Sequence, residues 1–246
     1  MMYNLLDKLL GSDKDLKGPN LARAPWLALD FSGTKLRYRD PMHTAMFPVN
    51  TFAEDRDIYN PDGYERQKRG HLARQFYIKG WDFKGRACRG GVRLSGRLFY
   101  YENELGKNFN CFEKADFEQQ IFEFCHAVWG WLNETEKVGD LGTKRYIYPI
   151  DSRDLDYLDI NGTRWCYFAS QAKGSPPEIE YACPLSSHHI LLLYFTLQGY
   201  SGTDFYSPET NLEQVTFQYV KDFMANFYIE LSDEAKAQQA VAKQPL

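Results

Sequence analysis

The chain has 246 residues, of which 43% are hydrophobic and 25% are charged, a composition typical of a globular domain. Its formal net charge of −4 argues against a dedicated nucleic-acid-binding domain, because such domains usually carry a surplus of basic residues. No run of about 18 apolar residues occurs, so the sequence predicts no segment that spans a membrane.

Strand patterns dominate the first part of the chain, at residues 26–31, 35–39, 72–81 and 92–101. Ser32-Gly33 separates the first two stretches and predicts a tight turn, so these two stretches are expected to form a hairpin. In the second stretch, outward charges alternate with Leu36 and Tyr38. The interval 40–70 is punctuated by Pro and Gly and predicts a long irregular segment, a kind of segment that often carries function.

The rest of the chain predicts two amphipathic helices around a second group of strands. Apolar residues recur every three or four positions at 116–134 and at 209–225, and Asp116 with Gln119 resembles a capping box. Asn161-Gly162 is typical of a type I′ hairpin turn. The second group of strand patterns covers residues 156–160, 163–169, 178–183 and 188–197.

Grouped strands with helices between the groups predict an α+β fold rather than alternating β/α units. Short connections favour a mainly antiparallel sheet of about seven to nine strands, with two main amphipathic helices and a short C-terminal helix capped by Ser232. No linker interrupts the strand signals. We therefore expect a single domain over residues 1–246, with residues 1–25 and 232–246 peripheral or mobile.

The sequence lacks the motifs of common catalytic and cofactor sites. It contains no P-loop, no dinucleotide-binding glycine pattern and no G-x-S-x-G turn of serine hydrolases. The five cysteines are odd in number and include no C-x-x-C pair, which favours reduced thiols in a cytoplasmic protein over disulfides or a zinc ribbon. We therefore predict no cofactor, no metal ion and no catalytic residues of a known motif.

The densest basic run in the chain consists of Arg86, Arg89, Arg93 and Arg97. Arg93 and Arg97 are four residues apart on an expected strand, so both side chains should project from one face. One interpretation is a docking face for an acidic partner or a phosphate, and the other is a solvated sheet face with cross-strand pairs to Asp or Glu. His188 and His189 are neighbours on another expected strand and should point to opposite faces.

The segment 181–195, which reads YACPLSSHHILLLYF, leads through Pro-Leu-Ser and two histidines into a hydrophobic strand. It resembles a segment of uncharacterised bacterial proteins, some of which are similar to immunity partners of secreted toxins. The early segment 30–39 and the late helix 209–225 are similar to parts of the same proteins. The resemblance implies a protein that binds a toxin, and it identifies no catalytic residue.

Three hypotheses on function follow. The first is a non-enzymatic protein-binding domain, specifically a bacterial immunity protein that occludes a toxin, whose candidate contact residues are Arg86, Arg89, Arg93, Arg97 and His188. The second is an enzyme, such as a hydrolase, with a site built from His188, Asp151 and Arg93. The third is a small-ligand binder with a cavity lined by Phe and Tyr. Aromatic residues make up 16% of the chain, which favours an aromatic β core over a surface aromatic patch for a partner.

Overall fold

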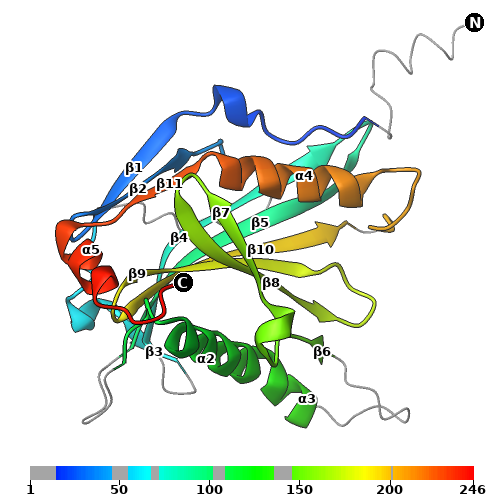
Figure 1. Ribbon diagram of the computed structural model, residues 1–246. Helices are drawn as coiled ribbons and strands as arrows, with labels where there is room; N and C mark the ends of the chain where they lie inside the picture. The colour runs from blue at the N-terminus through cyan, green and yellow to red at the C-terminus, as the bar shows by residue number, and fades with distance from the viewer. Residues whose placement is uncertain (1–14, 46–54, 68–71, 102–108, 136–145, 201) are drawn as a thin grey trace, which may run out of the picture.

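The computed structural model describes residues 15–45, 55–67, 72–101, 109–135, 146–200 and 202–246. Two antiparallel sheets form its centre, and helices lie on both faces of the larger sheet (Figure 1). The expected α+β fold with a mainly antiparallel sheet is therefore confirmed. The predictions for residues 1–14 lie outside the described residues.

The larger sheet has eight strands. Seven of them follow the order β3-β4-β5-β10-β9-β8-β6, and β7 also pairs with β8. The strands are β3 (Glu65–Arg66), β4 (Leu72–Lys84), β5 (Cys88–Tyr100), β6 (Tyr146–Ile147), β7 (Asp156–Ile160), β8 (Thr163–Ala172), β9 (Glu178–Ser186) and β10 (His189–Gly199). The hairpin between β7 and β8 turns at Asn161-Gly162, where both residues have positive φ, as the type I′ prediction requires.

The smaller sheet has the order β1 (Trp26–Phe31), β2 (Thr34–Arg39) and β11 (Phe227–Glu230). Its first two strands form the expected hairpin, and Ser32 and Gly33 both have positive φ at the turn. The described residues contain eleven strands, more than the expected seven to nine. The difference comes from β3 and β6, which have two residues each and are too short to leave a clear pattern.

The helices are α2 (Lys114–Cys125), α3 (Trp131–Thr135), α4 (Leu212–Ala225) and α5 (Asp233–Ala240). A π-helical turn, η3 (His126–Gly130), joins α2 to α3 within the expected helix 116–134. At Gly130 a Cβ atom would lie 2.7 Å from the hydroxyl oxygen of Tyr148, so a side chain there would collide with the neighbouring segment. Among the described helices, none is long and apolar enough to cross a bilayer.

The expected capping box of Asp116 and Gln119 is wrong. The helix begins at Lys114, with Glu113 in the N-cap position and no side-chain cap. Asp116 instead accepts a hydrogen bond from the backbone N–H of Asn110, at 2.9 Å. Glu113 accepts hydrogen bonds from the backbone N–H groups of Lys243 and Gln244 and so ties the C-terminal segment to the start of α2.

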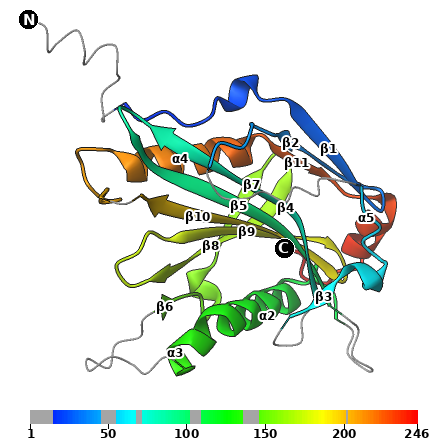
Figure 2. The same cartoon turned by 180° about the vertical axis from the view of Figure 1, so that it is seen from behind.

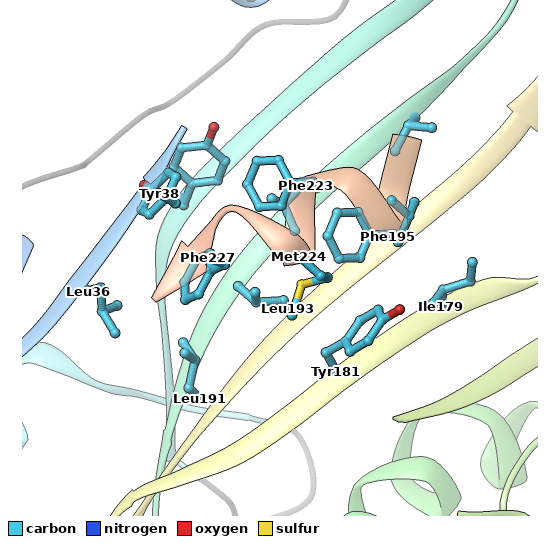
Figure 3. Close-up of a cluster of buried hydrophobic side chains, with 14 of the residues drawn as sticks. Leu36, Tyr38, Ile179, Tyr181, Leu191, Leu193, Phe195, Phe223, Met224 and Phe227 are labelled. Atoms are coloured by element: carbon cyan, nitrogen blue, oxygen red, sulfur yellow. The ribbon is translucent and has the colours of Figure 1, made fainter. Parts of the chain in front are cut away.

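Two hydrophobic clusters lie on opposite faces of the larger sheet, as the continuous apolar run of β10 requires. On one face Leu191, Leu193 and Phe195 pack under α4 and the smaller sheet (Figure 3). On the other face Ile190 and Leu192 pack under α2. Both views show α4 and α2 on opposite sides of this sheet (Figure 1, Figure 2). The aromatic side chains expected to line a cavity include several that pack on one another in the core: Tyr38, Tyr77, Phe195, Phe223 and Phe227.

Candidate functional site

The predicted basic run does not form one cluster. Arg93 and Arg97 project from the same face of β5, as expected, because alternate residues of a strand share a face. Arg86 lies in the connection between β4 and β5, and Arg89 lies at the start of β5. Arg93 and Arg97 therefore belong to the sheet face, whereas Arg86 belongs to its margin.

His188 lies at the other end of β5 from Arg89. Its carbonyl oxygen accepts a hydrogen bond from the backbone N–H of Tyr101, directly after the last residue of the strand. Its Nδ1 atom is 2.7 Å from the Ser187 hydroxyl oxygen. No contact among the described residues joins any two of His188, Asp151 and Arg93, the three groups of the hydrolase hypothesis. Asp151 pairs instead with Arg153, at 2.6 Å, and caps the short helix η4 (Ser152–Asp154).

A serine–histidine pair does occur, one residue further along the chain. The Ser186 hydroxyl oxygen lies 2.6 Å from His189 Nδ1, and His189 Nε2 lies 2.8 Å from the carbonyl oxygen of Ile58. A carbonyl only accepts, so Nε2 carries the hydrogen and Nδ1 accepts from Ser186. This chain of serine, histidine and acceptor has the connectivity that hydrolases use to activate a nucleophile.

Burial gives this pair a structural role. Ser186 and His189 are both fully buried, so no substrate carbonyl reaches the hydroxyl in this structure. Burial also lowers the pKa of His189 to about 4, which keeps the ring neutral. The rings of Tyr59 and Tyr100 pack against the imidazole, with ring centres 5.2 and 5.0 Å away. The pair thus satisfies the polar groups of the connection between β9 and β10.

The strongest exposed constellation lies on the outer face of the smaller sheet. Trp26 of β1 stands opposite Arg39 of β2, and Arg37 stands opposite Tyr228 of β11. The Cζ atoms of Arg37 and Arg39 lie 4.3 and 4.2 Å from the centre of the Trp26 ring. The rings of Trp26 and Tyr228 meet edge to face, with centres 5.8 Å apart. These four residues are named the Trp26 cluster below.

The alternation of each strand explains why the Trp26 cluster faces solvent. Leu29 and Phe31 point inward from β1 into the core, so Trp26 and Ala28 point outward. Trp26 is 38% exposed and Tyr228 is 39% exposed, which are high values for large aromatic side chains. The outer face of the smaller sheet is therefore open to a partner at this point.

The charge on this face is uneven along the strands. Two arginines flank Trp26, whereas Asp30 and Glu230 both stand opposite Lys35 at the other end of the sheet. The Trp26 end is therefore cationic. Arg39 is also held in place, since its Nη1 atom donates a hydrogen bond of 2.7 Å to the carbonyl oxygen of Ala24. The cluster can receive a carboxylate on its guanidinium groups and an apolar or aromatic side chain on its rings.

Part of this surface follows from the sequence. The second strand of the hairpin carries the predicted outward charges, whereas a surface aromatic patch was only an alternative without a location. Trp26 and Tyr228 lie near opposite ends of the chain, and only the pairing of β11 with β2 brings them together. No local pattern of residues reports that pairing.

A comparison with protein-family models, curated proteins and solved structures finds no match for this chain. Within the described part of the chain, no group of three or more His, Cys, Asp or Glu side chains is arranged to hold a metal ion.

Proposed function

We propose that this chain is a non-enzymatic binding protein that holds a partner protein on the Trp26 cluster. The observation that carries the proposal is an exposed tryptophan contacted by two arginine guanidinium groups and by the edge of a tyrosine ring. Trp, Tyr and Arg are the residue types that dominate the binding free energy of protein interfaces. Their concentration on an open sheet face supports an interface rather than a solvated surface.

The contacts within the Trp26 cluster also lower the entropy cost of binding. Arg37 lies against both aromatic rings, and Arg39 is hydrogen-bonded to the backbone, so the side chains are ordered before a partner arrives. Ordering a flexible side chain at an interface costs about 0.5–1.5 kcal/mol. A cluster that is already ordered avoids much of that cost, which favours tight and specific binding.

The resemblance to immunity-type proteins suggests the class of partner. Under this proposal the partner is a secreted bacterial toxin, and the chain acts in the bacterial cytoplasm by covering the toxin's working surface. The cationic end of the cluster favours a partner surface that carries Asp or Glu beside an apolar or aromatic side chain. Arg93 and Arg97 lie on a different sheet from this cluster, so they are not part of the proposed interface.

Affinity purification from the source organism, at several salt concentrations, tests the proposal. The wild-type chain should recover one protein in stoichiometric amount, and Trp26→Ala should reduce its affinity at least ten-fold, since hot-spot truncations cost about 2 kcal/mol or more. Trp131→Ala is the matched control because Trp131 has a similar exposed fraction, 41%, on α3. Equal recovery by Trp26→Ala and wild type, with both folded, contradicts the proposal, as does recovery of no partner.

A further inference from the structure

A second polar surface lies on the face of the larger sheet that α2 covers only in part. The strand registers place its side chains in rows across β5, β10, β9 and β8. The first row is Arg93, Thr196, Glu178 and Ser170, the second is Ser95, Tyr194, Glu180 and Phe168, and the third is Arg97, Leu192, Ala182 and Cys166. Directly paired residues share a face, so all twelve side chains project from one side.

Several polar atoms on this surface lack partners. Both carboxyl oxygens of Glu180, one of Glu178 and the hydroxyl oxygen of Ser170 are buried without a hydrogen bond. Ser170 lies beside Glu180 and favours its charged form, but the two groups complete no hydrogen bond of ordinary geometry. Buried polar groups in folded proteins are nearly always hydrogen-bonded, so a group of such atoms in one place calls for a specific explanation.

Positive groups with unused donors lie on the same surface. Arg97 is partly buried and makes no hydrogen bond or ion pair with a described residue. Arg93 is exposed, and its Nη2 atom is 3.4 Å from the Thr196 hydroxyl oxygen. Both guanidinium groups act electrostatically on Glu178, but no ion pair joins either of them to it. Arg93, Arg97, Glu178, Glu180 and Ser170 are named the Arg–Glu face.

The arrangement excludes simpler ligands. A lone cation on the carboxyl groups would be repelled by the two arginines, and a lone anion on the arginines would be repelled by Glu178. One molecule with both charges satisfies both sets of groups. Strands lie about 4.8 Å apart, so Arg93 and Glu178, separated by β10, start from backbones about 10 Å apart. That separation is of the order of the length of a short molecule with one charge at each end.

The element that borders this surface is unusual. Burial raises the pKa of the thiol of Cys125, the last residue of α2, and the nearby carboxyl group of Glu180 adds to that rise. The π-helical turn η3 follows directly. π-Helical turns are rare and occur frequently at functional sites. The buried indole N–H of Trp129, in this turn, also lacks a hydrogen-bond partner. The turn therefore contains an unused donor of its own, and the Trp129 ring stacks on Tyr146 of β6, with ring centres 5.4 Å apart.

We propose that the Arg–Glu face binds a small zwitterion of the amino-acid class. The ammonium group of the ligand lies against Glu178, the outer of the two carboxyl groups, with Glu180 behind it as a neutral hydrogen-bonding group. The carboxylate of the ligand lies on Arg93 and Arg97. This site is separate from the Trp26 cluster, so the proposal can be tested independently of the proposed protein partner.

Isothermal titration calorimetry with glycine, β-alanine and γ-aminobutyrate tests the proposal, because these probes differ only in the distance between their charges. At least one of them should bind with a stoichiometry of one. Ethylammonium and acetate, each of which carries a single charge, should bind at least ten-fold more weakly. The absence of binding by all three zwitterions overturns the proposal and leaves ordered water as the partner of the buried groups. Equal binding of either single-charge probe also overturns it.

Variants locate the site. Arg97→Met and Glu178→Gln should each weaken the binding of the zwitterion at least ten-fold. Arg86→Met removes an exposed arginine outside the Arg–Glu face and should leave binding unchanged. If Arg97→Met does not fold, Arg93→Met serves in its place, since the Arg93 side chain is exposed. Binding that survives both Glu178→Gln and the arginine variant, with the fold confirmed by circular dichroism, overturns the assignment.

Discussion

Glu178 and Glu180 are two residues apart on β9, and burial acts on them to different degrees. Glu180 is fully buried, and desolvation raises its pKa well above the ordinary range, with the charge of Glu178 adding to the effect. Glu178 is only partly buried. Desolvation raises its pKa to about 7, while Arg93 and Arg97 oppose that rise. At neutral pH the buried carboxyl group is therefore neutral and the outer one is partly ionised.

The pKa of Glu178 predicts a dependence of stability on pH. This pKa is raised in the folded state from the ordinary value of 4.5. The contribution of Glu178 to stability is therefore fully present below pH 4.5 and is lost as the pH rises through 7. Glu178→Gln removes the titration. The fall in the free energy of unfolding between pH 5 and pH 8 should be smaller in the variant than in wild type by about 1–2 kcal/mol. This figure allows for the partial exposure of Glu178, which weakens the effect. Urea denaturation at four pH values measures this, and parallel curves for the two proteins would contradict it.

Asn161 joins the turn between β7 and β8 to the smaller sheet. Its side-chain Nδ2 donates to the carbonyl oxygens of Ala225 and Phe227, at 3.0 and 2.8 Å. Asn161→Gly keeps the positive φ of the turn and removes only these bonds, so unfolding should become easier by about 1–2 kcal/mol. Asn211→Gly is the control, since Asn211 has a similar φ and makes no side-chain cap. Thermal and urea denaturation compare the two, and equal effects would show that the hydrogen bonds contribute nothing.

At the scale of elements, a β-bulge in β4 fixes the position of a core ring. The pairing of β4 with β5 shifts register between Gln75 and Tyr77, and Phe76 lies at the shift. A Cβ atom at Gly96 of β5 would lie 2.6 Å from the Phe76 ring. The same ring meets Phe31 of the smaller sheet edge to face, with centres 5.1 Å apart. Gly96 therefore allows the two sheets to share one packed side chain.

Gly96→Ala should destabilise the fold by about 1–3 kcal/mol, because a buried aromatic ring has no free space to move into. Phe76→Leu shortens the opposing side chain. The double variant should lose less stability than the sum of the losses in the two single variants, since the smaller side chain makes room for the added methyl group. A double-mutant cycle from urea denaturation measures the coupling, and strictly additive losses would show that the two residues do not collide.

At the scale of the whole molecule, the reactivity of the cysteine thiols shows whether both hydrophobic clusters are folded. All five are free: Cys88 is partly exposed, whereas Cys111, Cys125, Cys166 and Cys183 are buried. Burial also raises the pKa of each of these four thiols, so little reactive thiolate forms. Native protein should therefore release about one equivalent of chromophore from Ellman's reagent and five after unfolding in guanidinium. Cys88→Ser should abolish the native reaction, and rapid labelling of that variant would contradict the buried placement of the others.

At the scale of the whole molecule, the arrangement of the sheets keeps the two proposed binding surfaces apart. The larger sheet packs on both faces, against α4 and the smaller sheet on the first and against α2 on the second. The outer face of the smaller sheet carries the Trp26 cluster. The second face carries the Arg–Glu face, in which Arg93 is exposed whereas Glu180 and Ser170 are buried. Each surface rests on strands that are fixed by a packed core, which keeps its side chains in place.

Local patterns in the sequence determined the elements of this protein. Ser32-Gly33 and Asn161-Gly162 determined two hairpins because their backbone conformations suit only a few residue types. The apolar run of β10 determined a strand buried on both faces, and the outward position of Arg93 and Arg97 followed from alternation. These features depend on residues close together in the chain, so they can be deduced without the tertiary structure.

Only the tertiary structure decided which elements meet. The pairing of β5 with β10 and of β10 with β9 put Arg93 in one row with Glu178, and the pairing of β11 with β2 put Tyr228 beside Trp26. It also placed Ser186 and His189 in the interior rather than at a surface. Strand order follows from apolar burial summed over many residues that are distant in sequence, and no single segment encodes that sum.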